Sequence, residues 1–195
     1  QTICRQPDHQ TINKYPERNI VRIIFSLLLV GISLPIFSQS QVVMQQTIKD
    51  QATTMLEAFE DHNYNKLLDY TYPKIFELSG GKATMLEIIQ ESMQELELAG
   101  YMVDSANIGE PGPIYNAGDE LHAIISQFVY MTIPGGSMMN ESPLLAVSDN
   151  NGVSWYFLDT KQLNSNLKAY FFPNFNEDLK IPEPKPVIYD YEKKK

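Results

Sequence analysis

Residues 120–133 read ELHAIISQFVYMTI, and this stretch decides the fold prediction. Alternate side chains of a β-strand point to opposite faces of a sheet. The odd-numbered positions form a row that is apolar except for one amide: Leu121, Ala123, Ile125, Gln127, Val129, Met131 and Ile133. The stretch therefore predicts a long strand with this row on one face.

Shorter strands are predicted on both sides of this one. The alternating pattern recurs over residues 101–108, 137–148 and 153–159. Pro134-Gly135-Gly136 is typical of a turn, and Asn151-Gly152 is a strong hairpin signal. We expect these segments to form a mostly four-stranded antiparallel sheet.

Upstream of residue 100 the apolar spacing is helical. Residues 42–62, 64–70 and 82–99 each predict a helix, because their apolar side chains recur at three- and four-residue intervals. In the last of these, the stripe consists of Met85, Leu86, Ile89, Met93 and Leu96, and Gly100 is placed as the C-cap. Helices followed by an antiparallel sheet indicate an α+β fold.

The chain divides into three predicted regions. Residues 1–40 are an N-terminal extension with a signal peptide, and residues 41–172 form the α+β domain with a short helix over 160–170. Residues 173–195 are a Pro-rich tail, which we expect to be extended.

The signal peptide is predicted from residues 20–37, IVRIIFSLLLVGISLPIF. Basic Arg18 and Arg22 stand at its start, and Ser38-Gln39-Ser40 offers the small residues that a signal peptidase requires. The competing interpretation is a membrane anchor, but the apolar core is shorter than the ~20 residues that span a bilayer. We expect a secreted or periplasmic protein without stable membrane insertion after cleavage.

Charge and composition exclude several functions. The 195-residue chain has a net charge of −9 and a pI of about 4.8, which argues against nucleic acid as a partner. Residues 41–195 contain 22 acidic residues and 11 lysines, but no arginine and no cysteine. They therefore offer no disulfide and no thiolate, and we expect no cofactor. Two histidines without a metal-binding motif predict no metal site.

One helical segment suggests a family. Residues 64–90, YNKLLDYTYPKIFELSGGKATMLEIIQ, resemble uncharacterised secreted members of the nuclear transport factor 2-like superfamily, whose cone fold is shared with ketosteroid isomerase and SnoaL-like polyketide cyclases. With the element order, the resemblance covers residues 42–160. It implies helices closing over the concave face of a curved sheet, a pocket between them, and an opposite face that often forms a homodimer. It assigns no catalytic residue to this chain.

Four polar or aromatic residues are candidates for the lining of such a pocket. Gln127 interrupts an apolar row, so it either bonds to neighbouring backbone or a Tyr, or lines a cavity and meets a ligand or water. Tyr70 and Tyr72 either rim a pocket mouth or pack in the core. Asp104 lies on a strand, either as a solvated edge residue or as a pocket carboxylate with a raised pKa.

Trp155 is the fifth ligand-binding candidate. It ends the stretch SDNNGVSW, residues 148–155, which matches the Asp-box pattern of sialidases and related propellers. Propellers repeat this box, whereas this chain has one copy. The pattern therefore predicts a structural hairpin with Trp155 folded back over the turn.

The even-numbered face of residues 120–133 carries His122, Phe128 and Tyr130. We expect this face to be an exposed surface or a dimer interface. His122 is then a surface or dimer residue and not a catalytic one.

Three functions remain open. The favoured one is non-catalytic binding of a small apolar or amphipathic ligand in the pocket. The alternatives are an isomerase- or cyclase-type enzyme with a pocket carboxylate, and a dimeric protein-interaction module. No catalytic residue is assigned.

Overall fold

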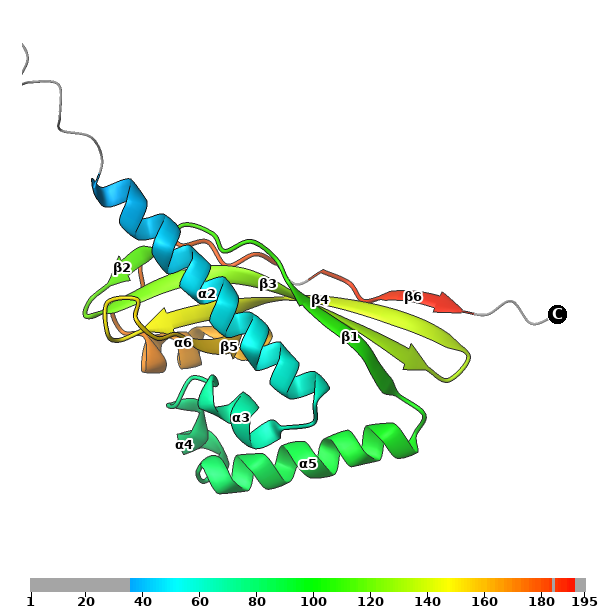
Figure 1. Ribbon diagram of the computed structural model, residues 1–195. Helices are drawn as coiled ribbons and strands as arrows, with labels where there is room; N and C mark the ends of the chain where they lie inside the picture. Colours follow the sequence, from blue (N-terminus) through cyan, green and yellow to red (C-terminus); the bar gives the residue numbers. More distant parts are fainter. Residues whose placement is uncertain (1–35, 184, 192–195) are drawn as a thin grey trace, which may run out of the picture. The chain divides into compact units, whose positions relative to one another are not determined.

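The computed structural model describes residues 36–183 and 185–191. Most of the predicted signal peptide lies outside them, while Ser38-Gln39-Ser40 fall in the first helix. The helices and strands follow in chain order (Figure 1): α2 (Ile36–Glu60), α3 (Tyr64–Asp69), α4 (Ile75–Ser79), α5 (Lys82–Leu98), β1 (Met102–Ile108), β2 (Tyr115–Ala117), β3 (Glu120–Ile133), β4 (Gly136–Ser148), β5 (Tyr156–Asp159), the 3-10 helix η1 (Thr160–Gln162), α6 (Ser165–Phe171) and β6 (Ile188–Tyr191). No helix among these residues is long and apolar enough to cross a bilayer.

The predicted α+β class is confirmed, but the sheet has six strands and not four. All the pairs of named strands are antiparallel, in the order β1-β3-β4-β5, with β2 beside β3 and β6 beside β4. The β3–β4 hairpin forms the centre of the sheet. Its residue pairs run without interruption from Leu121 opposite Ser148 to Ile133 opposite Gly136. The sequence missed β2 and β6 because these strands of three and four residues show no recognisable alternation, and neither has a hairpin signal such as the one that precedes β5.

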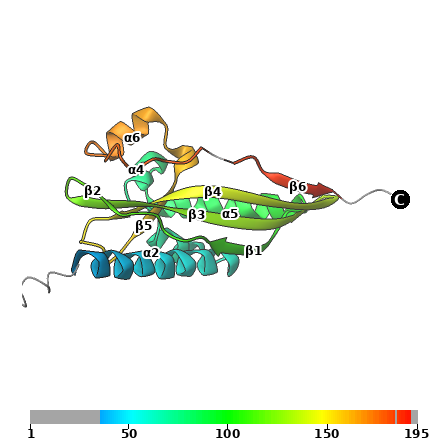
Figure 2. The same cartoon turned by 90° about the horizontal axis from the view of Figure 1, so that it is seen from above.

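Helix α2 covers one face of the sheet, which we call the α2 face (Figure 2). Its apolar stripe packs on the first part of the odd-numbered row of β3, at Leu121, Ala123 and Ile125. Together the two elements supply much of one buried cluster, which contains Ile48, Ala52, Met55, Leu56, Ala123 and Ile125 with Leu144 and Ala146 of β4, Phe157 of β5 and Trp155 just before β5.

The opposite face of the sheet, the α6 face, is partly covered by the chain's own C-terminal segment (Figure 2). Phe171 and Phe172 at the end of α6, and Leu179 beyond it, are buried against Leu145, Val147 and Leu158. Lys185 bonds to Glu141 of β4 at 2.8 Å. The Pro-rich segment, which the sequence placed outside the domain, thus packs on this sheet.

Helix α5 is the least buried of the long elements. None of its 17 residues is buried, and its stripe residues Met85, Leu86, Ile89 and Met93 are only half-buried. Gly100 follows the helix with a φ of 85°, in agreement with its predicted capping role. A helix with an apolar stripe normally buries it against a neighbour, so the space in front of α5 is the first place to look for a site.

The Asp-box stretch forms the expected hairpin turn. Ser148 Oγ accepts a hydrogen bond from the Gly152 backbone N–H at 2.9 Å, and Trp155 Nε1 donates to the Gly152 carbonyl at 3.1 Å. Gly152 has a φ of 83°, and a Cβ there would stand 2.5 Å from Met44 Sδ of α2. The motif therefore fixes a turn that packs against Met44, near the start of α2.

Candidate functional site: an apolar pocket in front of α5

A cavity of about 320 Å³ lies between α5, the remaining N-terminal helices and the α2 face, near the β5 edge of the sheet. We call it the α5 pocket. Its wall is largely apolar: Met55, Leu56, Phe59, Leu67, Leu68, Ile75, Met85, Ile89, Val129, Leu144, Phe157 and Leu158. Four polar residues complete it: Thr71, Gln127, Asp159 and Gln162. A largely apolar cavity with a few polar groups is the usual form of a small-molecule site.

The apolar stripe of α5 forms one wall of this pocket. Met85 and Ile89 line it, whereas the neighbouring Ile88 points away and is 46% exposed. Across the cavity, Val129 and Gln127 come from the odd-numbered row of β3. The half-burial of α5 thus follows from the cavity between helix and sheet.

Gln127 is both hydrogen-bonded and in contact with the cavity. Its Nε2 donates to Ser142 Oγ at 3.0 Å, and Ser142, directly opposite on β4, is fully buried. The partner is a serine side chain and not the backbone or tyrosine that the sequence suggested, and Gln127 also lines the pocket.

Asp159 is the carboxylate of the pocket, and the sequence reasoning missed it. One of its oxygens accepts from the Lys161 backbone N–H at 2.8 Å and caps η1. Asp159 lies opposite Leu144, which belongs to the α2-face cluster, so the Asp159 side chain shares that face. An Asp that ends a strand and caps the next turn was the available signal, although it does not tell which cavity the side chain meets.

The other predicted ligand residues lie outside the α5 pocket lining. Tyr70 is half-buried against the α2-face cluster, and Trp155 is fully enclosed in it. Tyr72 is buried on the α6 face. Asp104 is exposed at an irregularity of β1 and accepts from Thr132 Oγ1 at 3.0 Å. Of the five, Gln127 lines the pocket.

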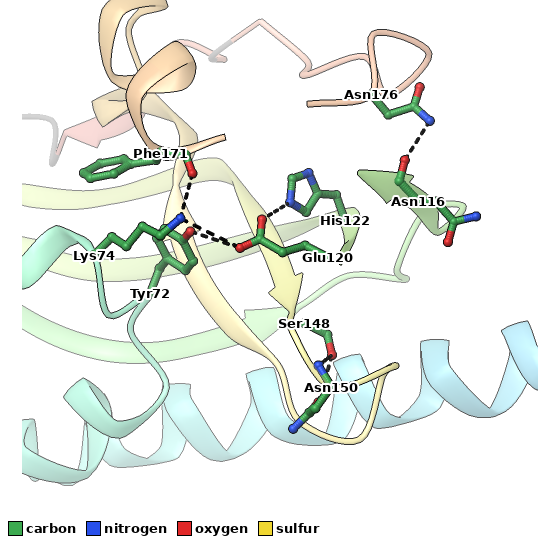
Figure 3. A network of polar contacts seen from close by, with 9 residues as sticks. All are labelled: Tyr72, Lys74, Asn116, Glu120, His122, Ser148, Asn150, Phe171 and Asn176. Carbon is green, nitrogen blue, oxygen red and sulfur yellow. Dashed lines mark hydrogen bonds and ion pairs between the residues drawn. The ribbon is translucent and has the colours of Figure 1, made fainter. Parts of the chain in front are cut away.

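A second polar group lies on the other side of the sheet (Figure 3). Glu120 is at its centre, with its carboxylate 3.0 Å from His122 Nε2 and 3.4 Å from the Tyr72 hydroxyl, which donates to it. Lys74 Nζ is 4.0 Å from Glu120 and donates to the Phe171 carbonyl at 3.0 Å. We call these four residues the Glu120 cluster: Tyr72, Lys74, Glu120 and His122.

Burial sets the protonation states in the Glu120 cluster. It raises the pKa of Tyr72, and the negative charge of Glu120 raises it further, so the hydroxyl stays protonated. Burial also lowers the pKa of His122, with a smaller contribution from Lys74, while Glu120 opposes the change in part. His122 Nδ1 is buried without a hydrogen-bond partner among the described residues.

These groups mainly bind one another and hold the C-terminal segment. The His122 ring packs edge-on against Phe172, with centroids 5.1 Å apart, and lies 5.6 Å from Phe175. A cavity of about 160 Å³ adjoins the cluster, beside Asp119 and Asn174. Asn176 also donates to the Asn116 carbonyl of β2 at 3.0 Å (Figure 3).

The predicted dimer face is divided by this packing. His122 is fully buried under Phe172 and Phe175, so its assignment to an open surface is wrong. Phe128 is half-buried, and Tyr130 is 39% exposed. The sequence could not show that a segment fifty residues later covers one end of the face.

Among the described residues, no three His, Cys, Asp or Glu side chains are grouped so that they could hold a metal ion. Comparison of the chain with protein-family models, with curated proteins and with solved structures finds no match.

Proposed function

We propose that the protein binds a small apolar or amphipathic ligand in the α5 pocket. The observation that carries this proposal is the 17-residue helix α5, which has no buried residue and faces a 320 Å³ cavity with Met85 and Ile89. A helix that served only to complete the core would be expected to close onto the sheet, because each buried CH₂ stabilises the fold by about 0.8 kcal/mol. A ligand in the cavity supplies the missing contacts.

The size of the cavity limits the ligand. At about 30 Å³ for each group of the size of a water molecule or methylene, 320 Å³ accommodates about ten such groups. This is the size of a medium-length alkyl chain or two fused rings.

A second function, an isomerase-type enzyme, is favoured by Asp159. A carboxylate beside an apolar cavity can act as a general base, and Gln127 on the same face can hydrogen-bond to the substrate. The partly open Phe128–Tyr130 face supports the third function, a dimeric interaction module. Ligand binding needs neither a reaction nor a partner, and we favour it for that reason.

Two broader proposals accompany this one. Kinship with the nuclear transport factor 2-like fold is supported by the order of helices and strands and by a pocket between them. Export to a secreted or periplasmic location is supported by the pattern of residues 20–37.

The pocket is tested with N-phenyl-1-naphthylamine, an uncharged two-ring probe whose fluorescence rises in apolar surroundings. Ile89→Trp and Val129→Trp would fill the cavity from the helix and from the sheet. Ile88→Trp adds the same ring one position away, on the exposed side of α5. Circular dichroism checks that each variant is folded.

We expect wild type and Ile88→Trp to bind the probe alike, and both filling variants to bind at least about tenfold more weakly, since a loss of about 1.4 kcal/mol suffices. Equal binding by all four proteins, or no binding by wild type, would refute the proposal.

A further inference from the structure

The polar atoms that the α5 pocket offers to a ligand are mainly hydrogen-bond acceptors. Gln127 uses its Nε2 to bond Ser142, and its Oε1 has no hydrogen-bond partner among the described residues. Because Gln127 lines the cavity and Oε1 is not among the enclosed unpaired atoms, this oxygen has access to the cavity. Gln127 therefore offers the cavity an unpaired acceptor, Oε1, besides the second N–H of its Nε2.

Asp159 adds a negative charge to the same face. One oxygen of its carboxylate caps η1 by accepting from Lys161 N, and for its other oxygen no bond is found among the described residues. Thr71 donates its hydroxyl proton to the Leu67 carbonyl at 3.3 Å, which leaves its oxygen as a further acceptor. Gln162, at the exposed rim, is the pocket's remaining polar residue.

The strand register places Gln127 and Asp159 on either side of β4. Gln127 is opposite Ser142, and Asp159 is opposite Leu144. Ser142 and Leu144 are two residues apart on one strand, so all four side chains share the α2 face. A ligand head group over this part of β4 would meet acceptors from both neighbouring strands.

Within the part of the chain that the structure describes, no cation lines this end of the pocket. Among the described residues, none of those that line it is a lysine or arginine. Lys161 Nζ, the ammonium nearest in sequence to Asp159, donates to Asn140 Oδ1 at 2.9 Å. An anionic head group would therefore be desolvated beside a carboxylate without a counterion, which is strongly unfavourable.

We propose that the α5 pocket takes an apolar molecule with a hydrogen-bond-donating head group, a hydroxyl or a protonated primary amine, and rejects the corresponding carboxylate. This inference rests on the ligand-binding function proposed above. Gln127 Oε1 and Asp159 accept the protons of the head group, and the apolar body lies against Ile89 and Val129. Hydrogen bonds to charged groups change affinity by about tenfold to a hundredfold, and this is the expected discrimination.

The test compares three ligands with the same ten-carbon chain: decylamine, 1-decanol and decanoate. Their affinities for the protein are measured by calorimetry at pH 7 and 0.15 M salt, below the concentrations at which the ligands aggregate. Asp159→Asn removes the pocket charge and keeps an oxygen that can cap η1. Asp190→Asn, on exposed β6, is the matched control for the change in net charge.

We expect decylamine and decanol to bind at least tenfold more tightly than decanoate. In Asp159→Asn, the ratio of decylamine to decanoate affinity should fall by at least tenfold, with no such change in Asp190→Asn. Decanoate binding as tightly as decylamine, or the same change in both variants, would overturn the head-group inference.

These failures are distinguishable from failure of the proposed function. If decanoate is preferred and Ile89→Trp abolishes its binding, the pocket binds ligands but the assignment of its head group is wrong. If none of the three ligands binds and N-phenyl-1-naphthylamine does not bind either, both proposals fall.

Discussion

Replacement of His122 by phenylalanine should remove a pH-dependent loss of stability. The side chain is fully buried between Glu120 and the rings of Phe172 and Phe175. At pH 8 the variant loses the hydrogen bond to Glu120 but also loses a buried, unpaired Nδ1. These two effects are of similar size and opposite sign, so the free energies of unfolding should agree within about 2 kcal/mol at that pH.

At lower pH, the free energies of unfolding of wild type and His122→Phe should diverge. Burial lowers the pKa of His122 in the folded protein, so below pH 6.5 the unfolded chain binds a proton that the folded chain does not. Stability then falls as the pH decreases from 6.5, by up to about 1.4 kcal/mol per pH unit from this one group. This loss of stability ends once the pH falls below the pKa that His122 has in the folded protein. The charged groups that act on the ring are Glu120 and Lys74, and the Tyr72 hydroxyl bonds to Glu120; all three residues remain in the variant.

The assay is urea unfolding at half-unit steps from pH 8 to pH 5, followed by the fluorescence of Trp155, the single tryptophan of the chain. The difference in stability between wild type and His122→Phe should change in favour of the variant as the pH falls. His62→Gln is the control, since His62 has a side chain that is 59% exposed and lies 3.5 Å from Glu97. Parallel pH curves for wild type and His122→Phe would contradict the reasoning.

Two further substitutions test the packing on either face. Phe172→Ala removes a ring that contacts both Tyr72 and His122, and it should lower the free energy of unfolding by about 3–5 kcal/mol in urea titrations; a loss below 1 kcal/mol would mean that the segment does not cover the sheet. Gly152→Ala imposes a Cβ at positive φ and against Met44 Sδ, so it should cost at least about 1 kcal/mol; Gly135→Ala, which has a similar φ but open space, separates the backbone strain from the clash.

Much of the fold could be predicted because its signals are local. The alternation in residues 120–133 specified β3, and the same alternation placed Ala123 and Ile125 toward α2. The stripe of α5 specified the helix, but periodicity describes only which side is apolar. It does not tell how closely that side approaches a partner, so the cavity in front of Ile89 was not visible in the sequence.

The candidate site was only partly predictable because it depends on contacts between distant segments. Gln127 was found since an amide in an apolar row is conspicuous within one strand. Asp159 was missed because its place in the pocket follows from the register of β5 on β4. His122 was misassigned because the rings that cover it lie about fifty residues away: Phe172 ends the domain predicted from the sequence, and Phe175 belongs to the region that looked like a separate tail.

The most direct test of the central claim is a set of nuclear Overhauser effects between bound 1-decanol and the isoleucine and valine methyl groups of the protein. Ligand binding in the α5 pocket predicts contacts to Ile89 and Val129 and none to the neighbouring Ile88. Contacts to Ile188 on exposed β6, without any to Ile89 or Val129, would contradict it.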